Sequence, residues 1–493
     1  MTGGSHFDSD DTLYAEMARE MVNSGNLLDN QWSGTVLFEK PPLYLWSLAI
    51  SGHFLGWDEA AMRLPGTLFS IGALLAFWWL MRGMGLSPPR ALTAVGLLAT
   101  SYFFLLLTRR LMTDVPLLCC VLSSSAAFVH GRLRWSGLFA GAALLAKGLA
   151  AGPLLLALLV FAFVSGRLRA LGARRALEGV VCALLVGAPW HLAETLRHGS
   201  EFWSGYVGYH VGSRATSLVV PGLTLSELGA AGLEEGLLLV GGLVGLLMAA
   251  WSRWRDRSQT DSSGESVSTE DQAGTEVELF AFIWLLCSLI PVVMSTTRLP
   301  HYLLPVVPAF CLFSVTAVPL AFWKKRMAPL VAGMVVVLAF VWTPAKLVFW
   351  LDPNFGADEK VLGEAIARTA VTGDLTATYN TTSSALTFYS GGHRFLIAAD
   401  DPRFYEVQDA VLMVQRAGVL VALEPSGFPA ADAGGRRFVV ARADPDLDAL
   451  VTRMHQTVPN RPLYVLHTRD SGGLALVNDA GIGEPVGGLG ARL

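Results

Sequence analysis

Carboxylate and cationic side chains are concentrated in the first forty residues, ahead of a long series of apolar segments. Asp10 and Asp11 precede the segment Thr12–Met21, and Glu39 and Lys40 precede two consecutive prolines. A membrane protein does not need this many carboxylates beside its first span in order to fold. Charged loops at the mouth of a helical bundle are where such proteins usually bind polar substrates or catalyse reactions.

The acidic pair Asp10-Asp11 and the charged pair Glu39-Lys40 each have two interpretations. Adjacent helical residues point about 100° apart, so only one of Asp10 and Asp11 can point into a given site. That carboxylate can act as a general base toward an attacking hydroxyl, or the pair can cap the following helix. The prolines after Glu39 and Lys40 fix where these charges point, although the pair can equally be an interfacial salt bridge with a snorkelling lysine.

Further cations occur at positions where an apolar helix has no need of them. Arg109, Arg110 and Asp114 lie at the end of one predicted helix pair, and Arg214 follows His210 in a long loop. Lys147 interrupts an apolar run, where a lysine requires an anionic partner or ligand. Together these cations suit a phosphate head group. The alternative is that they are structural charges that neutralise the carboxylates.

The segment Arg298–Pro308 contains three prolines at the end of a predicted span. It places a cation (Arg298), an imidazole (His301) and a phenol (Tyr302) at the membrane boundary. These groups can bind a polar substrate. Alternatively, Tyr302 belongs to an aromatic belt and Arg298 is an interfacial anchor.

The composition predicts a polytopic membrane protein. The chain has 493 residues, of which 53% are hydrophobic and only 15% are charged. The net charge of −4 argues against a nucleic-acid partner. All five cysteines lie in apolar segments, which predicts no disulfide or zinc framework. No signal peptide is expected from the first ten residues.

Apolar segments predict about ten membrane spans, because a helix needs about 20 residues to cross a bilayer. They lie near residues 61–82, 90–107, 112–130, 135–148, 149–166, 177–195, 229–251, 277–296, 301–323 and 328–350. Every second loop is short and rich in arginine or lysine, which predicts that these loops are cytoplasmic. The candidate site residues then face the outer side. If residues 1–60 face outward, a preceding span is needed to carry them across the membrane, so we expect that a first helix is missing from the chain as given. The alternative is a short amino-terminal tail that is translocated unaided.

Three regions follow from this topology. Residues 1–60 form an extracytoplasmic catalytic loop with amphipathic helices, and residues 61–350 form the transmembrane helical domain. A polar, serine-rich stretch at 258–276 is predicted to be a disordered cytoplasmic loop. Residues 351–493 alternate helical patterns with short apolar runs, which predicts a soluble extracytoplasmic α/β domain.

Seven ordered motifs, covering about residues 10–310, resemble the polyprenyl-phosphate-sugar-dependent GT-C glycosyltransferases, which include the lipid A aminoarabinose transferase and the protein O-mannosyltransferases. Residues 379–389 resemble the family's carboxyl-terminal region more weakly. The motifs are Asp10-Asp11 before a Tyr-Ala-Glu-x-Ala-Arg-Glu run, Phe38–Leu43, Ala61–Pro65, Arg109 with Asp114, Lys147-Gly148, Pro189-Trp190 and Arg298–Pro305.

The resemblance implies a multi-span helical fold of GT-C type that takes a sugar from a polyprenyl-phosphate carrier at the extracytoplasmic face. It places Asp10 as the catalytic base, with Asp11 beside it. It implies carrier-phosphate contacts at Lys40, Arg109, Lys147, Arg298 and Tyr302. Glu39 with His210 resembles a carboxylate–imidazole pair that can hold a zinc ion, although two ligands make a poor zinc site and the spacing around His210 departs from the family by one residue.

We therefore predict a multi-pass glycosyltransferase of a bacterial inner membrane, with its active site facing the periplasm and a role in glycosylation of lipids such as lipopolysaccharide. It requires no cofactor. The acceptor can be lipid A, another lipid, a glycan or a protein. A transporter or flippase for a lipid-linked or anionic substrate is the alternative, although the polar residues cluster on one face and no inverted repeat is visible. A third possibility is a scaffold whose outer domain binds a ligand.

Overall fold

The architecture was obtained as a computed structural model. It describes residues 9–32, 35–38, 40–213, 224–235, 237–258, 269–295, 298–318, 320–323, 329–330, 333–334, 337, 341, 357–371, 374–379, 384–391, 396–398, 437–442, 448, 450–452, 463–467, 474–478 and 480–485.

The chain divides into two units. One comprises Met1–Leu37, Leu48–Met62 and Leu351–Leu493, and is called the amino/carboxyl-terminal unit here. The other comprises Phe38–Ser47 and Arg63–Trp350, and is called the helical unit. Helices α2 (Leu43–Leu55) and α3 (Glu59–Gly83) each contribute residues to both units.

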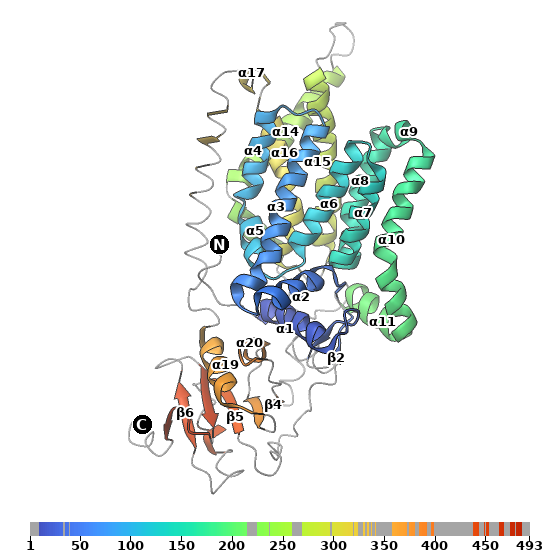
Figure 1. The fold of residues 1–493 in the computed structure, drawn as a ribbon. Helices are drawn as coiled ribbons and strands as arrows, with labels where there is room; N and C mark the ends of the chain where they lie inside the picture. Colours follow the sequence, from blue (N-terminus) through green and yellow to red (C-terminus); the bar gives the residue numbers. More distant parts are fainter. Residues whose placement is uncertain are drawn as a thin grey trace. The chain divides into compact units, whose positions relative to one another are not determined.

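The helical unit is built from apolar helices, and from α3 to α11 these helices are joined by short turns (Figure 1). After α3, the described elements are α4 (Pro88–Ala99), α5 (Tyr102–Arg109), α6 (Asp114–Val129), α7 (Leu133–Lys147), η1 (Gly148–Ala151), α8 (Gly152–Val164), α9 (Arg167–Leu171), α10 (Ala173–His198), α11 (Ser200–Trp203), η2 (Ser204–Ser213), α13 (Leu225–Gly232), η3 (Leu233–Glu235), α14 (Leu237–Ser258), α15 (Thr269–Met294), η4 (Pro300–Val306), α16 (Val307–Thr316) and α17 (Leu320–Trp323).

Among the described residues, four helical stretches are long and apolar enough to cross a membrane. They are Glu59–Gly83, Leu133–Val164, Ala173–His198 and Gln272–Met294. Helices α4 and α5 together add a fifth, bent by 57°. Other predicted spans correspond to shorter apolar helices such as α6, and the last one, at 328–350, lies almost wholly outside the described residues. The protein is a multi-pass membrane protein.

Residues 133–164 form two antiparallel helices, α7 and α8, which are joined by η1. Gly148 has a φ of +57°, a conformation that side chains other than glycine rarely adopt, and it ends α7. At the far end of α8, Arg167 donates a hydrogen bond over 3.1 Å to the carbonyl oxygen of Val129, which lies just before α7. The chain therefore reverses at Lys147-Gly148, as the sequence predicted.

Glycines allow α7 and α10 to pack backbone against backbone. A β-carbon added at Gly141 would lie 2.5 Å from the carbonyl oxygen of Ala183, and one at Gly137 would meet the carbonyl oxygen of Gly179 even more closely. Small residues at every fourth position permit this approach in membranes, where the hydrophobic effect does not drive helices together. The close packing fixes the end of α7 that carries Lys147.

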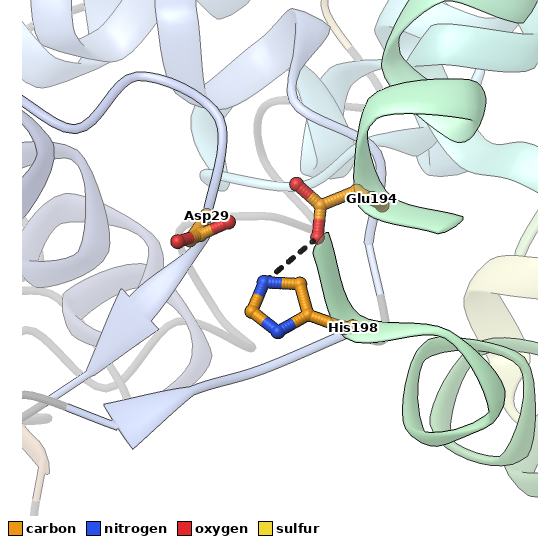
Figure 2. A group of neighbouring side chains, drawn as sticks. All are labelled: Asp29, Glu194 and His198. Atoms are coloured by element: carbon orange, nitrogen blue, oxygen red, sulfur yellow. Dashed lines mark ion pairs between the residues drawn. The ribbon is translucent and has the colours of Figure 1, made fainter. Parts of the chain in front are cut away.

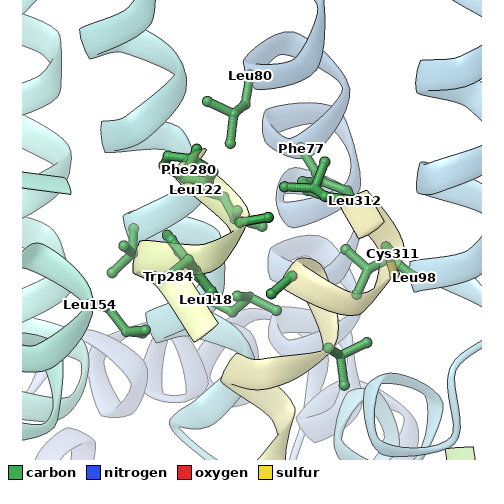
Figure 3. Packing of buried hydrophobic residues seen from close by; sticks show 14 of the residues in the cluster. Phe77, Leu80, Leu98, Leu118, Leu122, Leu154, Phe280, Trp284, Cys311 and Leu312 are labelled. Carbon is green, nitrogen blue, oxygen red and sulfur yellow. The ribbon is translucent and has the colours of Figure 1, made fainter. Parts of the chain in front are cut away.

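The core of the helical unit is an apolar cluster drawn from α3, α4, α6, α8, α15 and α16 (Figure 3). Phe77, Phe280 and Trp284 are its largest fully buried side chains among those labelled. The indole Nε1 of Trp284 donates over 2.6 Å to the carbonyl oxygen of Pro305. This bond satisfies the buried indole and ties α15 to the segment that carries His301 and Tyr302.

The amino/carboxyl-terminal unit contains α1 (Ser9–Ser24), a short hairpin and a mixed sheet. Its other described elements are β1 (Gln31–Trp32), β2 (Thr35–Val36), α19 (Ala357–Thr369), β3 (Leu375–Tyr379), α20 (Ser384–Tyr389), β4 (Leu396–Ala398), β5 (Arg437–Arg442), β6 (Tyr464–His467), β7 (Leu474–Asn478) and β8 (Glu484–Pro485).

The sheet has the strand order β4-β3-β5-β7-β6-β8. Strands β4, β3 and β5 are parallel, and the other pairings are antiparallel. Leu362 and Ile366 of α19, Leu386 of α20 and Leu476 of β7 form its buried core. The predicted α/β composition of the carboxyl-terminal region is confirmed.

The prediction of a disordered loop at residues 258–276 is wrong in part. Residues 269–276 belong to the first two turns of α15, and Ser258 ends α14. Arg167 explains part of this order, because it makes a two-pronged ion pair with Glu276 at 2.5 and 2.9 Å. The remaining residues, 259–268, lie outside the described residues.

Candidate active site

The centre of the candidate site is a buried ion pair between Asp114 and Lys147. Asp114 is the first residue of α6 and Lys147 the last residue of α7, so the antiparallel pairing of these helices brings them to the same end of the helical unit. The Nζ–Oδ1 distance is 2.6 Å, and the side chains are 14% and 4% exposed for Lys147 and Asp114. A carboxylate at a helix amino terminus and a cation at a carboxyl terminus both suit the helix dipoles.

The segment η4 adds an imidazole and a phenol to this pair. Leu299 is extended, as expected before a proline, and η4 begins at Pro300. The Lys147 Nζ lies 5.5 Å from the centre of the Tyr302 ring, which is a cation–π contact. The rings of His301 and Tyr302 are 4.7 Å apart. Lys147 is therefore held by a carboxylate and by an aromatic ring.

Two more cations lie nearby, one within electrostatic reach of Asp114 and the other within reach of His301. Asp114 interacts with Lys40 and His301 as well as with Lys147. His301 interacts in turn with Lys147, Lys40 and Arg110. Asp114 is therefore within reach of two lysines, and Arg110 is within reach of the neighbouring imidazole. Residues from four distant parts of the sequence meet here, and we call them the cation cluster: Lys40, Arg110, Asp114, Lys147, His301 and Tyr302.

The turn after Lys147 is supported by a chain of polar contacts. A β-carbon at Gly148 would collide with the hydroxyl of Tyr206. That hydroxyl lies 2.9 Å from Nε2 of His191, whose Nδ1 lies 2.7 Å from the carbonyl oxygen of Gly187. Because a carbonyl only accepts, Nδ1 donates to Gly187 and Nε2 accepts from Tyr206. Burial raises the pKa of Tyr206, which keeps it a donor.

The predicted acidic pair lies on α1, in the other unit. Asp10 and Asp11 are in the first turn of this helix, and Asp11 is 2% exposed. The side chain of Asp10 lies outside the described residues. A helix amino terminus favours the ionised form of carboxylates in its first turn.

The remaining predicted residues have different outcomes. Arg109 is half-buried at the last position of α5, while Arg298 donates from Nε and Nη2 to the carbonyl oxygen of Val293 at 3.3 and 3.2 Å. Arg298 therefore caps the end of α15. Glu39, Arg214 and the side chain of His210 lie outside the described residues, so the predicted zinc pair is not placed.

Sequence reasoning missed a carboxylate–imidazole pair on α10. The Nε2 of His198 lies 3.7 Å from Oε2 of Glu194, whose side chain is only 1% exposed (Figure 2). Phe38 packs its ring 4.9 Å from the ring of His198. Asp29, also drawn in Figure 2, belongs to the other unit, where it accepts a hydrogen bond over 2.7 Å from Asn26. The four-residue spacing of Glu194 and His198 was the available signal.

Comparison with known proteins gives consistent findings. Residues 39–192 match the family model described as dolichyl-phosphate-mannose-protein mannosyltransferase. The chain is 27% identical over 372 residues to undecaprenyl phosphate-alpha-4-amino-4-deoxy-L-arabinose arabinosyl transferase 1 of Pseudomonas fluorescens. That alignment covers 70% of this chain and 62% of the relative, so the chain spans less than two thirds of the relative's length.

Solved structures share the fold. ArnT from Cupriavidus metallidurans, in its crystal structure bound to undecaprenyl phosphate, superposes with a TM-score of 0.70 at 16% identity, covering 97% of this chain and 95% of that one. The oligosaccharyltransferase of Archaeoglobus fulgidus superposes with a TM-score of 0.52 at 12% identity, covering 97% of this chain and 71% of that one. The predicted fold class, a polytopic helical membrane protein of GT-C type with a carboxyl-terminal α/β domain, is confirmed. The predicted resemblance to the lipid-linked-sugar glycosyltransferases is confirmed as well.

Proposed function

We propose, on the premise of this resemblance, that the chain is a membrane glycosyltransferase that moves a sugar from a polyprenyl-phosphate carrier to a hydroxyl or phosphate of an extracytoplasmic acceptor. The observation that carries the proposal is the cation cluster. Lys147 and Lys40 both interact with the buried carboxylate of Asp114, and Arg110 interacts with the neighbouring His301. A phosphate-bearing donor would supply the negatively charged group that these cations are suited to bind.

The cluster suits the charge that develops during the transfer. As the bond between the anomeric carbon and the phosphate oxygen breaks, the polyprenyl phosphate leaves with the electron pair and gains negative charge. Lys147 is already held by Asp114 and by the Tyr302 ring, so little reorganisation is needed when that charge forms. Cations that are preorganised and partly shielded from water stabilise such a transition state most strongly.

Asp10 is the proposed general base. The acceptor oxygen attacks the anomeric carbon from the side opposite the phosphate, which inverts the configuration, and its proton passes to Asp10. Support comes from the motif that Asp10 shares with the family and from its place in the first turn of α1, where the helix dipole favours an ionised carboxylate. Asp11, the neighbouring carboxylate, is the second candidate.

The proposed location is the periplasmic face of a bacterial inner membrane. Arg132 and Arg134 lie at the junction of α6 and α7, whereas Asp114 and Lys147 lie at the opposite ends of these two helices. The positive-inside rule assigns the arginine end to the cytoplasm. This assignment puts the cation cluster on the outer side, where an activated sugar has to arrive already attached to a lipid.

A zinc ion has no role in the proposed mechanism. The predicted donors, Glu39 and His210, supply one carboxylate and one imidazole, fewer than the three or four protein ligands that zinc sites usually have. The transfer described above uses only side chains of the chain itself. A transfer rate that is unchanged by a chelator would agree with this.

The proposal is tested with purified protein in detergent and radiolabelled polyprenyl-phosphate sugars. The relatives' names make undecaprenyl-phosphate-linked 4-amino-4-deoxy-L-arabinose the first donor, followed by mannose, glucose and galacturonate. Lipid A is the first acceptor, followed by other lipids, glycans and protein serines.

We expect turnover of one donor, and a loss of about 10²- to 10⁴-fold in Asp10→Asn, the usual contribution of a general base. Asp11→Asn is the matched variant and should lose less. Donor binding without turnover in the unaltered protein would contradict the proposal and favour a transport or binding function.

A further inference from the structure

Helix α20 of the carboxyl-terminal α/β domain is bonded to α1, the helix that carries Asp10 and Asp11. Arg19 of α1 donates from Nη1 to the carbonyl oxygen of Phe388 and from Nη2 to that of Thr387, each over 3.3 Å. Its guanidinium also lies 5.4 Å from the centre of the Phe388 ring. Arg19 is 9% exposed, so these contacts are largely shielded from water.

The end of α20 is a suitable receptor for an arginine. The last carbonyl groups of a helix have no partners within the helix, and they carry the negative end of its dipole. Gly391, with a φ of +78°, closes α20 and donates over 3.1 Å to the same Phe388 carbonyl. Glu16, one turn before Arg19 on α1, makes an ion pair with it and fixes the direction of the guanidinium.

A second bond joins α20 to the amino-terminal part of the chain. The hydroxyl of Tyr389 donates over 3.1 Å to Oε1 of Glu59, the first residue of α3. Lys360 of α19 approaches the same oxygen at 2.7 Å. Consecutive residues of α20 thus contact α1 and the start of α3, two segments more than 300 positions away in the sequence. The carboxyl-terminal domain is therefore tied to the amino-terminal segments by specific polar contacts.

We propose that Arg19 is a positioning residue for the proposed transfer and that α20 fixes the orientation of α1. This inference rests on the proposed function. Arg19 follows Asp11 by two helical turns, about 12 Å along the axis at 1.5 Å per residue. A rigid helix transmits any rotation or sliding at Arg19 to the acidic pair. A displacement of about 1 Å at a reacting group is enough to lower a rate by about 10²-fold.

The kinetic test compares Arg19→Ala, Arg19→Lys and Tyr389→Phe with the control Arg368→Ala. Arg368 lies on α19 of the same domain, and its ion pair with Glu364 is exposed. With the donor that supports turnover, we expect Arg19→Ala to lower kcat by about 10²-fold while the donor KM changes less than about twofold. Arg19→Lys should recover part of the loss, because lysine keeps the charge but not the two-pronged donor geometry. Tyr389→Phe should lower kcat by a smaller factor, and Arg368→Ala should have no effect.

The second test measures amide hydrogen exchange in peptides that cover residues 9–24, without any substrate. We expect faster exchange in Arg19→Ala than in Arg368→Ala, with α15 peptides unchanged. An unchanged kcat, or unchanged exchange in α1, would overturn the inference. If Arg19→Ala destabilises the whole protein, the test depends on Tyr389→Phe. An unchanged kcat in Tyr389→Phe would then reject the inference. If the unaltered protein transfers no sugar, the proposed function fails, and the exchange data still decide whether α20 holds α1.

Discussion

Two buried carboxylate–cation pairs among the described residues, one in each unit, differ in what surrounds them. Asp114 and Lys147 lie 33 residues apart and bridge two helices, with side chains 4% and 14% exposed. Glu16 and Arg19 lie one turn apart on α1, with side chains 4% and 10% exposed. Burial alone therefore does not distinguish the two pairs.

Their surroundings assign them different roles. Asp114 has a second cation, Lys40, within electrostatic reach in addition to its partner Lys147. Around Arg19 the further acceptors are backbone carbonyls of α20, which belong to the protein itself. A buried charge needs compensation. Where the protein supplies it, the pair is structural. Where two cations approach one carboxylate, as at Asp114, they are suited to bind a ligand of opposite charge.

The largest effect expected from this comparison is that of Lys147→Ala. Removing this cation should lower kcat/KM for the lipid-linked donor by about 10²- to 10³-fold, the range seen when one preorganised group at a developing charge is removed. The variant also leaves Asp114 buried without its partner, which destabilises the fold by about 3 to 5 kcal/mol. Kinetics at saturating acceptor, together with a thermal melt, would separate the two effects.

Two variants serve as controls for Lys147. Lys147→Arg keeps the charge and should retain more activity than Lys147→Ala. Arg134→Ala removes an exposed cation at the opposite end of α7, where its pair with Glu178 spans 3.0 Å. It should leave kcat/KM unchanged. Equal losses in Lys147→Ala and Arg134→Ala would show that general destabilisation, and not the cation cluster, explains the result.

The second largest effect concerns the pH dependence of the Glu16–Arg19 pair. Burial raises the pKa of Glu16 to about 7, against a smaller lowering by Arg19. Because the folded pKa lies above the unfolded value of 4.5, the contribution of Glu16 to stability is complete below pH 4.5 and is lost as the pH rises to about 7. The total change is about 3 kcal/mol, at 1.36 kcal/mol per pKa unit.

The measurement is the free energy of unfolding, or the thermal midpoint, of detergent-solubilised protein between pH 4 and pH 8. Glu16→Gln should remove this part of the pH dependence, because an amide does not titrate. Glu20→Gln, one position after Arg19 on the same helix, is the matched control and should keep it. A profile in Glu16→Gln that is as steep as that of the unaltered protein would reject the assignment to Glu16.

The sequence predicted the core of the cation cluster because membranes leave few alternatives. A lysine at the end of an apolar helix requires a partner, and the alternating loop charges place Asp114 at the same end of the adjacent helix. The reversal at Lys147-Gly148 was predicted for the same reason. Helix lengths were less predictable. α4 and α5 meet at a bend of 57° and α6 has only 16 residues, so apolar runs of similar length gave quite different helices.

The parts that sequence reasoning missed depend on contacts between distant residues. The sequence named Arg109 and Arg110 together, but only the position of the end of α5 shows that Arg110, which is extended, is within electrostatic reach of His301. No local pattern indicates that Arg19 meets the end of α20, 369 positions away. The hydrogen bond between Tyr206 and His191 likewise requires a chain reversal between α10 and η2.

A smaller effect is expected at Gly148, the turn beside Lys147. Gly148→Ala places a β-carbon at a φ of +57° and against the Tyr206 hydroxyl, so the turn must shift. The backbone conformation alone costs about 1 to 2 kcal/mol. We expect roughly a tenfold loss of kcat. The double variant Gly148→Ala/Tyr206→Phe removes the hydroxyl and should recover part of it. A double variant whose kcat is no higher than that of Gly148→Ala would show that the contact with Tyr206 does not contribute to the loss.

The smallest effect is expected at Arg298, where two interpretations remain in competition. Its guanidinium hydrogen-bonds the carbonyl oxygen of Val293, which makes it a cap of α15, whereas the family resemblance implies a contact with the carrier phosphate. An exposed contact of either kind contributes at most about 1 kcal/mol. If Arg298 also binds phosphate, Arg298→Ala should raise the donor KM roughly twofold to fivefold and leave kcat unchanged. Arg298→Lys, which keeps the charge but loses the fork that caps α15, should then restore the KM. A thermal midpoint that falls in both variants with a constant KM would assign Arg298 to the helix end alone and confine donor binding to the cation cluster.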